Sequence, residues 1–251
     1  MIAHRDCEKD ERIVIVGASL TGLRAAEALR RNGFAGQLTI VGDEKYLPYD
    51  RPPLSKQVLA GRLPVEHTPL AMLEDVHAQW ILGVAATALD VERRQVSLSN
   101  GEQLAFDQLL IATGTRARPW PAELGGKLDG VFLIRDRDDA QRLHERLARK
   151  PGRVLIAGGG FIGCEVASVC RELDLPVTLV ERGPSPLYGA LGSSIGGIVA
   201  RLQQQHGVDL RTRMTVAAFE GDEAGHLRPR SPGGWKFAGC GYRSCGSRSV
   251  A

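Results

Sequence analysis

The sequence has little of what marks several other classes of protein. Aromatic residues make up 5% of its 251 residues, and they are not interleaved with clustered basic residues, which argues against a nucleic-acid-binding surface. No apolar run approaches the length of a membrane span, and the charged start MIAHRDCEKDER lacks the apolar core of a secretory signal. We therefore expect a cytoplasmic protein that binds neither nucleic acid nor membrane.

Cysteine is also scarce, and its spacing is uninformative. The five cysteines form no C-x-x-C pair, which argues against a zinc site or a dithiol redox centre, so no metal is expected. Cys240 and Cys245 form a C-x4-C pair near the carboxyl end and leave a redox pair open as an alternative.

The charge is unevenly distributed along the chain. The formal net charge is +3, but residues 225–251 hold five basic and no acidic residues, so residues 1–224 carry −2. This last segment has no period of 2 or 3.6 and is rich in glycine, serine and arginine, which predicts a disordered or foreign end.

The hydrophobic fraction of 43% is enough for the core of one large or two ordinary domains.

Two stretches share one pattern, in which a short β-branched strand ends in glycine and a helix follows. The first has the strand RIVIVG (12–17), a helix over 20–32 and a strand ending at Asp43; the second has RVLIAGGG (153–160), a helix over 161–173 and a strand ending at Glu181. The repetition predicts an α/β fold with two Rossmann-like βαβ domains and parallel sheets.

Other elements are expected between and after these patterns. A proline-rich loop precedes Leu63, because prolines fix φ and lack a donor. A hairpin is predicted at Asn100-Gly101. The remaining predictions are a strand in FDQLLIATG, a helix in DDAQRLHERLARK, a helix over about 193–206 and a strand in VDLRT.

The turn GGGFIG (158–163) matches the dinucleotide fingerprint. Gly158 allows the tight turn, Gly160 the close approach of a pyrophosphate, and Gly163 the close packing of helix on strand. The amides at Phe161 and Ile162 begin the helix, where an anion is favoured. The alternative is a glycine-rich turn without a ligand.

Glu181, at the end of the following strand, favours NAD over NADP. Its carboxylate can accept hydrogen bonds from both ribose hydroxyls and would repel a 2′-phosphate by about 1 to 4 kcal/mol per charge pair. The neighbouring Arg182 would weaken that repulsion.

The turn GASLTG (17–22) has the same strand and helix context but carries Ser19 at the middle glycine position. The serine hydroxyl can donate a hydrogen bond to a phosphate that passes slightly farther out. Asp43 then stands where the ribose partner is expected. A vestigial turn is the alternative.

The combination of IVIVGASLTGLRAAEALR, LPYDRPPLSK, FDQLLIATG, LIRDRDDA and GGGFIGCEVAS resembles the FAD-dependent, NADH-oxidising ferredoxin and rubredoxin reductases, including the reductase components of oxygenase systems. These belong to the pyridine nucleotide-disulphide oxidoreductase superfamily. The resemblance covers residues 12 to about 224 and implies an FAD-binding domain over 1–118 and an NAD(P)-binding domain over 119–224. It also implies that an iron-sulfur ferredoxin or rubredoxin accepts the electrons.

The resemblance implies roles for further residues. Lys56 would lie near the flavin ring, paired with Glu165 in a partly desolvated ion pair, and a solvated surface lysine is the alternative. Arg135 would reach the flavin region and Ala85 would contact the adenine side through its backbone. The remaining FAD-binding residues implied are Gly17, Ser19, Leu20, Thr21, Gly22, Asp43, Ala112, Thr113 and Gly114.

The chain departs from the family after about residue 225. The further FAD-domain strand and the GD motif of the family are not recognisable there, which predicts a truncated or frameshifted gene and an incomplete first domain. Two alternatives stay open: a non-catalytic remnant that binds NADH through residues 120–224, and a flavoprotein similar to nitrite reductase or apoptosis-inducing factor.

Overall fold

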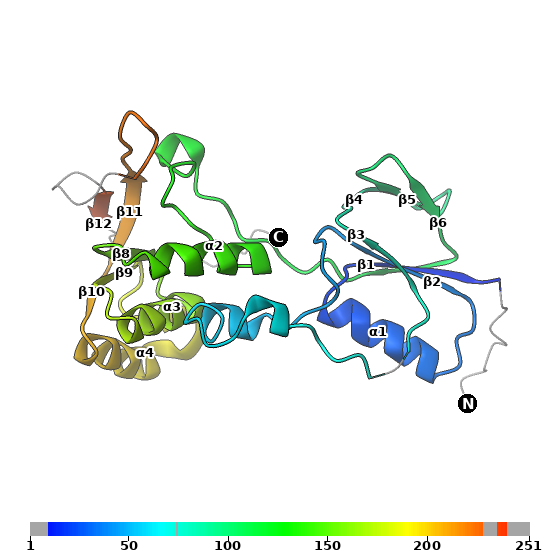
Figure 1. Cartoon of the computed structure of the whole chain (residues 1–251), viewed down its shortest axis with the longest axis horizontal. Coiled ribbons are helices and arrows are strands. Elements are labelled where there is room, and N and C mark those ends of the chain that lie inside the picture. Colours follow the sequence, from blue (N-terminus) through cyan, green and yellow to red (C-terminus); the bar gives the residue numbers. More distant parts are fainter. Residues whose placement is uncertain (1–9, 74, 228–234, 240–251) are drawn as a thin grey trace. The chain divides into compact units, whose positions relative to one another are not determined.

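The protein forms two compact units in a computed structural model, which describes residues 10–73, 75–227 and the backbone of 235–239. Unit 1 comprises Met1–Asp50 and Glu66–Arg116, and unit 2 comprises Arg51–Val65 and Ala117–Ala251. Figure 1 labels most of the helices and strands of both units. Each unit contains one of the two glycine-rich turns.

Unit 1 is built on a parallel sheet with the strand order β3-β2-β1-β7. Its β-branched runs suit strands that are covered on both faces. Helix α1 (Leu20–Arg31) connects β1 to β2 and buries Leu23 and Ala26 completely. The strands are β1 (Arg12–Val16), β2 (Gln37–Gly42), β3 (Gln79–Leu82) and β7 (Gln108–Ile111).

A small antiparallel sheet packs on the other face of this parallel sheet. Its strands are β4 (Ala86–Asp90), β5 (Gln95–Leu98) and β6 (Gln103–Ala105), in sequential order. Its Val96 and Leu98 pack against Val14 and Val41 of the parallel sheet. The hairpin expected at Asn100-Gly101 is confirmed, with Gly101 at φ +89°.

An ion pair joins the start of β1 to the residue before β7. The Arg12 guanidinium donates to both Asp107 carboxylate oxygens at 3.0 Å, and the Arg12 backbone N–H donates to the same carboxylate at 2.8 Å. The side-chain hydrogen bond from Arg12, followed by the backbone one, lowers the pKa of Asp107 to about 2.

We expect this pair to make the stability of unit 1 depend on pH in the acid range. Because the pKa of Asp107 is lower in the folded state, its contribution is complete above about pH 4 and is lost as pH falls through about 2. Denaturant unfolding of wild type and Asp107→Asn between pH 6 and pH 2 should show a difference that shrinks with acid. Glu102→Gln, at a carboxylate with no ion pair among the described residues, is the control. A constant difference down to pH 2 would contradict the expectation.

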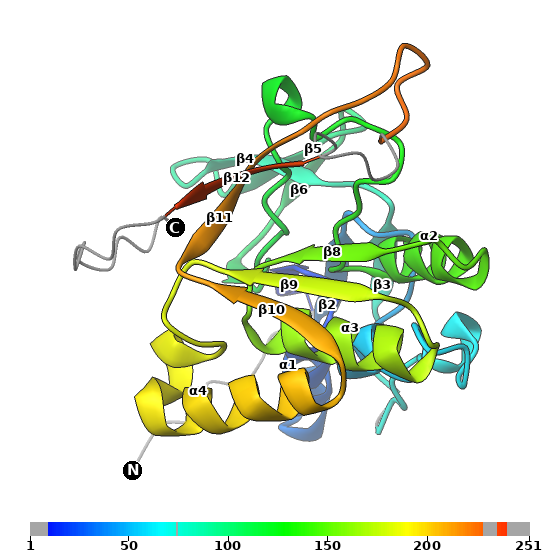
Figure 2. The same cartoon turned by 90° about the vertical axis from the view of Figure 1, so that its left-hand side faces the viewer.

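Unit 2 contains a three-stranded parallel sheet with the order β10-β9-β8. Figure 2 shows β9 between its two neighbours, with α3 and α4 on one side of the sheet. The strands are β8 (Val154–Ala157), β9 (Val177–Glu181) and β10 (Val208–Thr212), and the helices are α2 (Arg137–Ala148), α3 (Phe161–Glu172) and α4 (Tyr188–Gln205). Each strand of the second predicted βαβ pattern is therefore confirmed.

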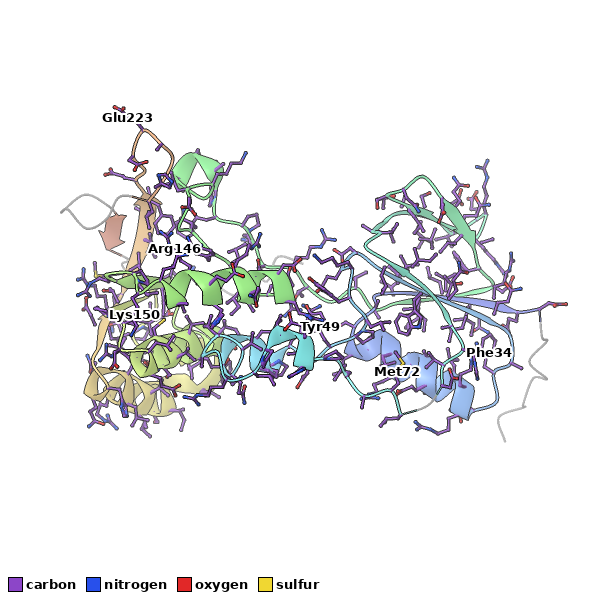
Figure 3. The ribbon with its side chains drawn as sticks, in the orientation of Figure 1. Phe34, Tyr49, Met72, Arg146, Lys150 and Glu223 are labelled. Atoms are coloured by element: carbon purple, nitrogen blue, oxygen red, sulfur yellow. The ribbon has the colours of Figure 1, made fainter. Side chains whose placement is uncertain are left out.

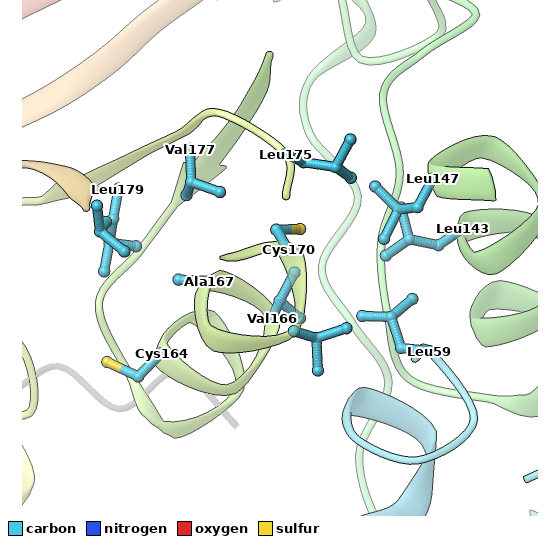
Figure 4. Packing of buried hydrophobic residues seen from close by; sticks show 12 residues of the cluster. Leu59, Leu143, Leu147, Cys164, Val166, Ala167, Cys170, Leu175, Val177 and Leu179 are labelled. Carbon is cyan, nitrogen blue, oxygen red and sulfur yellow. The ribbon is translucent and has the colours of Figure 1, made fainter. Parts of the chain in front are cut away.

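The segment Arg51–Val65 belongs to the core of unit 2, although it lies between two strands of unit 1 in the sequence. Leu59 is completely buried in the same cluster as Leu143 and Leu147 of α2 and Val166 of α3 (Figure 4). The expected proline-rich loop begins as a short 3-10 helix, η1 (Pro52–Ser55). Two further 3-10 turns lie at η2 (Val65–His67) and η3 (Ala122–Leu124).

Two regions differ from the sequence-based expectation. Helix α4 begins five residues before the predicted start at 193, and non-helical Gly192 (φ +75°) separates the added turn from the rest. Within the segment predicted to be irregular, β12 (Trp235–Gly239) pairs antiparallel with β11 (Met214–Phe219). Except for 225–227, the rest of that segment lies outside the described residues, as do Cys7, Cys240 and Cys245. No helix in the described part is long and apolar enough to cross a membrane.

Candidate functional site

The glycine turn of unit 2 has the geometry that its sequence predicts. Gly158 lies at φ +114°, in the region that only glycine adopts readily, and its N–H donates to the Val180 carbonyl at 2.8 Å. A Cβ on Gly163 would lie 1.9 Å from the Gly158 carbonyl oxygen, so helix and turn approach too closely for any side chain. A Cβ on Gly160 would meet nothing within 4 Å. Open space therefore lies in front of the middle glycine.

The first turn of α3 offers free donors beside this space. The first N–H groups of a helix have no intrahelical acceptor, and Gly160 at the N-cap has no side chain to occupy them. The aligned peptide dipoles make this end partly positive, which favours a phosphate. Phe161 and Ile162 are about half exposed beside it. The turn can therefore hold an anion.

Glu181 lies directly beside the same turn. One carboxylate oxygen accepts a hydrogen bond from the Gly159 N–H at 2.7 Å, and the other accepts from the Gly183 N–H. The Leu187 N–H donates to the Gly159 carbonyl at 2.8 Å, which ties the loop after β9 to the turn. Each carboxylate oxygen keeps a further lone pair, so the group can still accept ligand hydroxyls.

The turn of unit 1 repeats this geometry. Gly17 lies at φ +129°, and its N–H donates to the Val41 carbonyl of the neighbouring strand at 2.8 Å. A Cβ on Gly22 would lie 2.0 Å from the Gly17 carbonyl oxygen, which matches the relation of Gly163 to Gly158. The two turns are therefore built alike at their first and last glycines.

Ser19 fits the turn of unit 1 without backbone strain. It is the N-cap of α1 in an extended conformation (φ −127°), and its side chain makes no capping hydrogen bond. The N–H groups of Leu20, Thr21 and Gly22 at the helix start therefore lack a side-chain acceptor from the cap. With serine in place of the glycine of the fingerprint, the helix terminus can therefore still hold an anion.

Of the other candidate residues of unit 1, Ala112 contacts the glycine turn directly, and Asp43 pairs with an arginine. The Ala112 carbonyl packs directly against Gly17, where a Cβ would lie 2.1 Å away, and Gly114 follows at φ +65° with Thr113 between them. Asp43, after β2, forms an ion pair with Arg116, a partner that the sequence did not reveal. Asp43 and the 112–114 segment therefore lie after β2 and β7, the two strands that pair with β1 on either side.

Ala85 already uses its backbone groups. Its N–H donates to the Ser99 hydroxyl at 3.0 Å, and its carbonyl accepts from the Ser99 N–H at 2.8 Å. The carbonyl keeps one lone pair for a further donor.

In unit 2 the structure brings Lys56 and Glu165 together as the resemblance implies. The Lys56 ammonium lies 2.9 Å from one Glu165 carboxylate oxygen, with side chains 43% and 26% exposed. The Ser55 hydroxyl, which sequence reasoning missed, donates to the other oxygen. Arg135 lies close in the fold to this segment, because its carbonyl accepts from Arg51 at 3.0 Å.

A cavity of about 910 Å³ extends from the glycine turn of unit 2 along β8. Apolar side chains of β8 and of residues 131–134 line most of it, together with Arg146 of α2, which Figure 3 labels. In the part of the chain that is described, no strand pairs with this edge of β8. Because alternate residues of a parallel strand bond to opposite neighbours, Leu155 and Ala157 point their backbone groups to the cavity side. Sequence reasoning did not reveal this cavity.

The two described cysteines are buried thiols of α3. Burial raises the pKa of Cys164 to about 11, with smaller contributions from Glu181 and Glu165, and burial raises that of Cys170 to about 12. Both are free. They stay protonated near neutral pH and are poorly suited to thiolate chemistry.

These features define a protein with two Rossmann-type units, each with a glycine turn between its first strand and the following helix. The chain belongs to the pyridine nucleotide-disulphide oxidoreductase family, because the sequence model of that family matches residues 11–232. The family resemblance and the α/β fold predicted from the motifs are therefore confirmed.

Curated relatives narrow the comparison. The chain is 40% identical over 215 residues to the ferredoxin reductase component of chlorobenzene dioxygenase from Cupriavidus sp. (strain PS12). It is 41% identical over 217 residues to the ferredoxin–NAD(+) reductase component of the biphenyl dioxygenase system from Paraburkholderia xenovorans (strain LB400). Both alignments cover 84% of this chain and 52% of the relative. The chain thus spans about half the length of the curated relatives it matches.

Solved structures give the same result for the fold. The reductase in the covalent complex of putidaredoxin reductase with putidaredoxin matches with a TM-score of 0.81 and 32% identity, over 87% of this chain and 53% of that one. The structure of Fdr9 matches with a TM-score of 0.73 and 39% identity, over 83% and 51%.

Proposed function

We propose that the protein is an FAD-dependent oxidoreductase that takes electrons from NADH and passes them to an iron-sulfur ferredoxin or rubredoxin. The observation that carries the proposal is the pair of glycine turns, which have the same geometry on two separate parallel sheets. Two such turns suit two dinucleotides. The names of the relatives, which are ferredoxin reductase components of oxygenase systems, support the same activity and partner.

FAD is assigned to unit 1. The pyrophosphate would bind the α1 amides at 20–22 with the Ser19 hydroxyl as a further donor, and Gly17 allows the backbone to turn. Asp43 would accept from the adenosine ribose in place of the Arg116 guanidinium. The adenine would meet the free lone pair of the Ala85 carbonyl, and residues 112–114 would line the cofactor.

NADH is assigned to unit 2. Its pyrophosphate would bind the amides at Phe161 and Ile162, in the space in front of Gly160. Glu181 would accept from the adenosine ribose hydroxyls. Lys56, Glu165 and Arg135 are assigned to the flavin region by the family resemblance.

The chemistry needs placement more than a reactive side chain. When bound, FAD accepts a hydride from NADH and releases electrons singly to the iron-sulfur partner. The residues of this chain bind and orient the cofactors and keep a cation near the reacting region. The cytoplasmic location remains a prediction.

Purified protein tests the proposal directly. We expect a yellow preparation whose flavin absorbance bleaches when NADH is added without oxygen, and which then reduces a ferredoxin or rubredoxin. A colourless protein that still binds NADH would instead support the non-catalytic alternative. Efficient reduction of other acceptors without ferredoxin reduction would favour a flavoprotein similar to nitrite reductase or apoptosis-inducing factor.

Glu181→Gln should weaken the preference for NADH over NADPH. The substitution removes the charge that would repel a 2′-phosphate and keeps one carbonyl acceptor for the turn amides. The ratio of the NADPH and NADH dissociation constants should fall by roughly tenfold, the lower part of the expected repulsion. Fluorescence titration with both nucleotides measures the ratio. Arg182→Ala removes the charge that would weaken the repulsion and should shift the ratio in the opposite direction. An unchanged ratio would remove Glu181 from the ribose site.

A further inference from the structure

The Glu165 carboxylate is held from two sides by neighbouring residues of one segment. Its Oε1 lies 2.9 Å from the Lys56 ammonium, and its Oε2 accepts a hydrogen bond of 2.5 Å from the Ser55 hydroxyl. Ser55 is only 2% exposed, whereas Lys56 is 43% exposed. The buried member of this network is thus the serine.

The network depends on the packing of η1 against α3 within unit 2. Ser55 is the last residue of η1, and Glu165 lies in the second turn of α3, after the glycine turn. The Lys56 ammonium also donates to the Pro52 carbonyl at 3.1 Å. Two of its three N–H groups are therefore used inside the protein, and one remains for another acceptor.

A glutamate carboxylate that is held only by an ion pair can rotate about its last side-chain torsion. The last torsion of a glutamate side chain is broad, so a single contact to Lys56 does not determine which oxygen faces the ammonium. A hydrogen bond from a buried hydroxyl to the second oxygen removes that freedom, and charge-assisted hydrogen bonds are about twice as strong as neutral ones.

We propose that Ser55 is a positioning residue, whose hydroxyl orients the Glu165 carboxylate and thereby holds the Lys56 ammonium in place. The proposal rests on the proposed function in that the pair serves the step from NADH to flavin. Alanine at this position would keep the packing of η1 but release the carboxylate, and the lysine would lose its defined position.

The first test needs no cofactor. Acetic anhydride labels lysine amines, and mass spectrometry maps the rate at Lys56. An amine released from its partners reacts faster, so Ser55→Ala should raise the rate about three- to tenfold, the effect of losing roughly one ordinary hydrogen bond. Ser55→Thr keeps the hydroxyl and should restore the wild-type rate. Exposed Lys127 of the same unit should react equally in all variants.

A double-mutant cycle separates positioning from general loosening. Glu165→Gln should raise Lys56 labelling at least as much as Ser55→Ala, and adding Ser55→Ala to it should change nothing further. An unchanged Lys56 rate in Ser55→Ala would overturn the proposal. An equal rise from Ser55→Ala in both backgrounds would overturn it too, because Ser55 would then act independently of Glu165.

The second test uses FAD-loaded protein. Ser55→Ala should lower the rate of flavin reduction at saturating NADH about tenfold, leave the NADH dissociation constant unchanged, and be rescued by Ser55→Thr. If wild type retains no FAD, the proposed function fails while the labelling arm still decides whether Ser55 positions Lys56. If NADH reduces the flavin of wild type and of Ser55→Ala equally fast, the positioning role of Ser55 is wrong while the proposed function stands.

Discussion

Gly163→Ala is expected to unfold or strongly destabilise unit 2. The new Cβ would lie 1.9 Å from the Gly158 carbonyl oxygen, which belongs to backbone and cannot move without opening the turn. Overlaps of this kind in packed structure cost about 3 kcal/mol or more. Denaturant unfolding followed by circular dichroism measures the loss.

Two alanine variants in the same unit serve as controls for Gly163→Ala. Gly152→Ala adds a Cβ that meets nothing within 4 Å in an exposed loop, so stability should change by less than about 1 kcal/mol. Gly160→Ala also meets nothing within the protein, but its Cβ occupies the space assigned to the pyrophosphate. It should therefore fold normally and bind NADH more weakly. Wild-type stability of Gly163→Ala would show that α3 can move away from the turn.

Lys56→Ala is expected to slow the reduction of bound flavin by NADH by roughly one to two orders of magnitude, since misplaced or missing charge near a reacting centre has effects of this size. The change removes the ammonium that lies 2.9 Å from Glu165 and leaves that carboxylate with Ser55. Stopped-flow absorbance at saturating NADH measures the rate.

The control for Lys56→Ala must separate catalysis from binding. Lys127→Ala removes an exposed lysine of the same unit and should leave the rate unchanged. FAD content and NADH affinity, measured on each protein, should stay near wild type for both variants. Unaltered stopped-flow reduction in Lys56→Ala would remove this residue from the site.

Local patterns predicted the two βαβ units well, because each depends on residues close together in sequence. The runs at β8 and β9 are short aliphatic stretches rich in β-branched residues; Gly158 follows the first and Glu181 ends the second, as is typical of buried parallel strands. The hairpin at Asn100-Gly101 and the glycines of both turns follow from backbone conformations that few other residues adopt.

In two other regions, tertiary packing determined a structure that the local sequence pattern did not predict. The start of α4 was missed because Gly192 interrupts the helical pattern. In the structure the chain is helical both before and after this glycine. The segment Arg51–Val65 has no helical or strand period, and burial of Leu59 against Leu143 and Leu147 is what assigns it to unit 2. No local signal in the segment reports those partners.

The sequence by itself determined the α/β class, the two glycine turns and the family, since these depend on spacing within a few residues and on the conformational freedom of glycine. Only the tertiary structure decided which unit holds Lys56, and that Ser55 shares Glu165 with it across 110 residues of chain. It alone also revealed the partner of Asp43 and the edge of β8 with which none of the described strands pairs. Hydrogen bonds and packing between distant segments depend on how the elements are arranged in space, and local residue spacing contains no information about that arrangement.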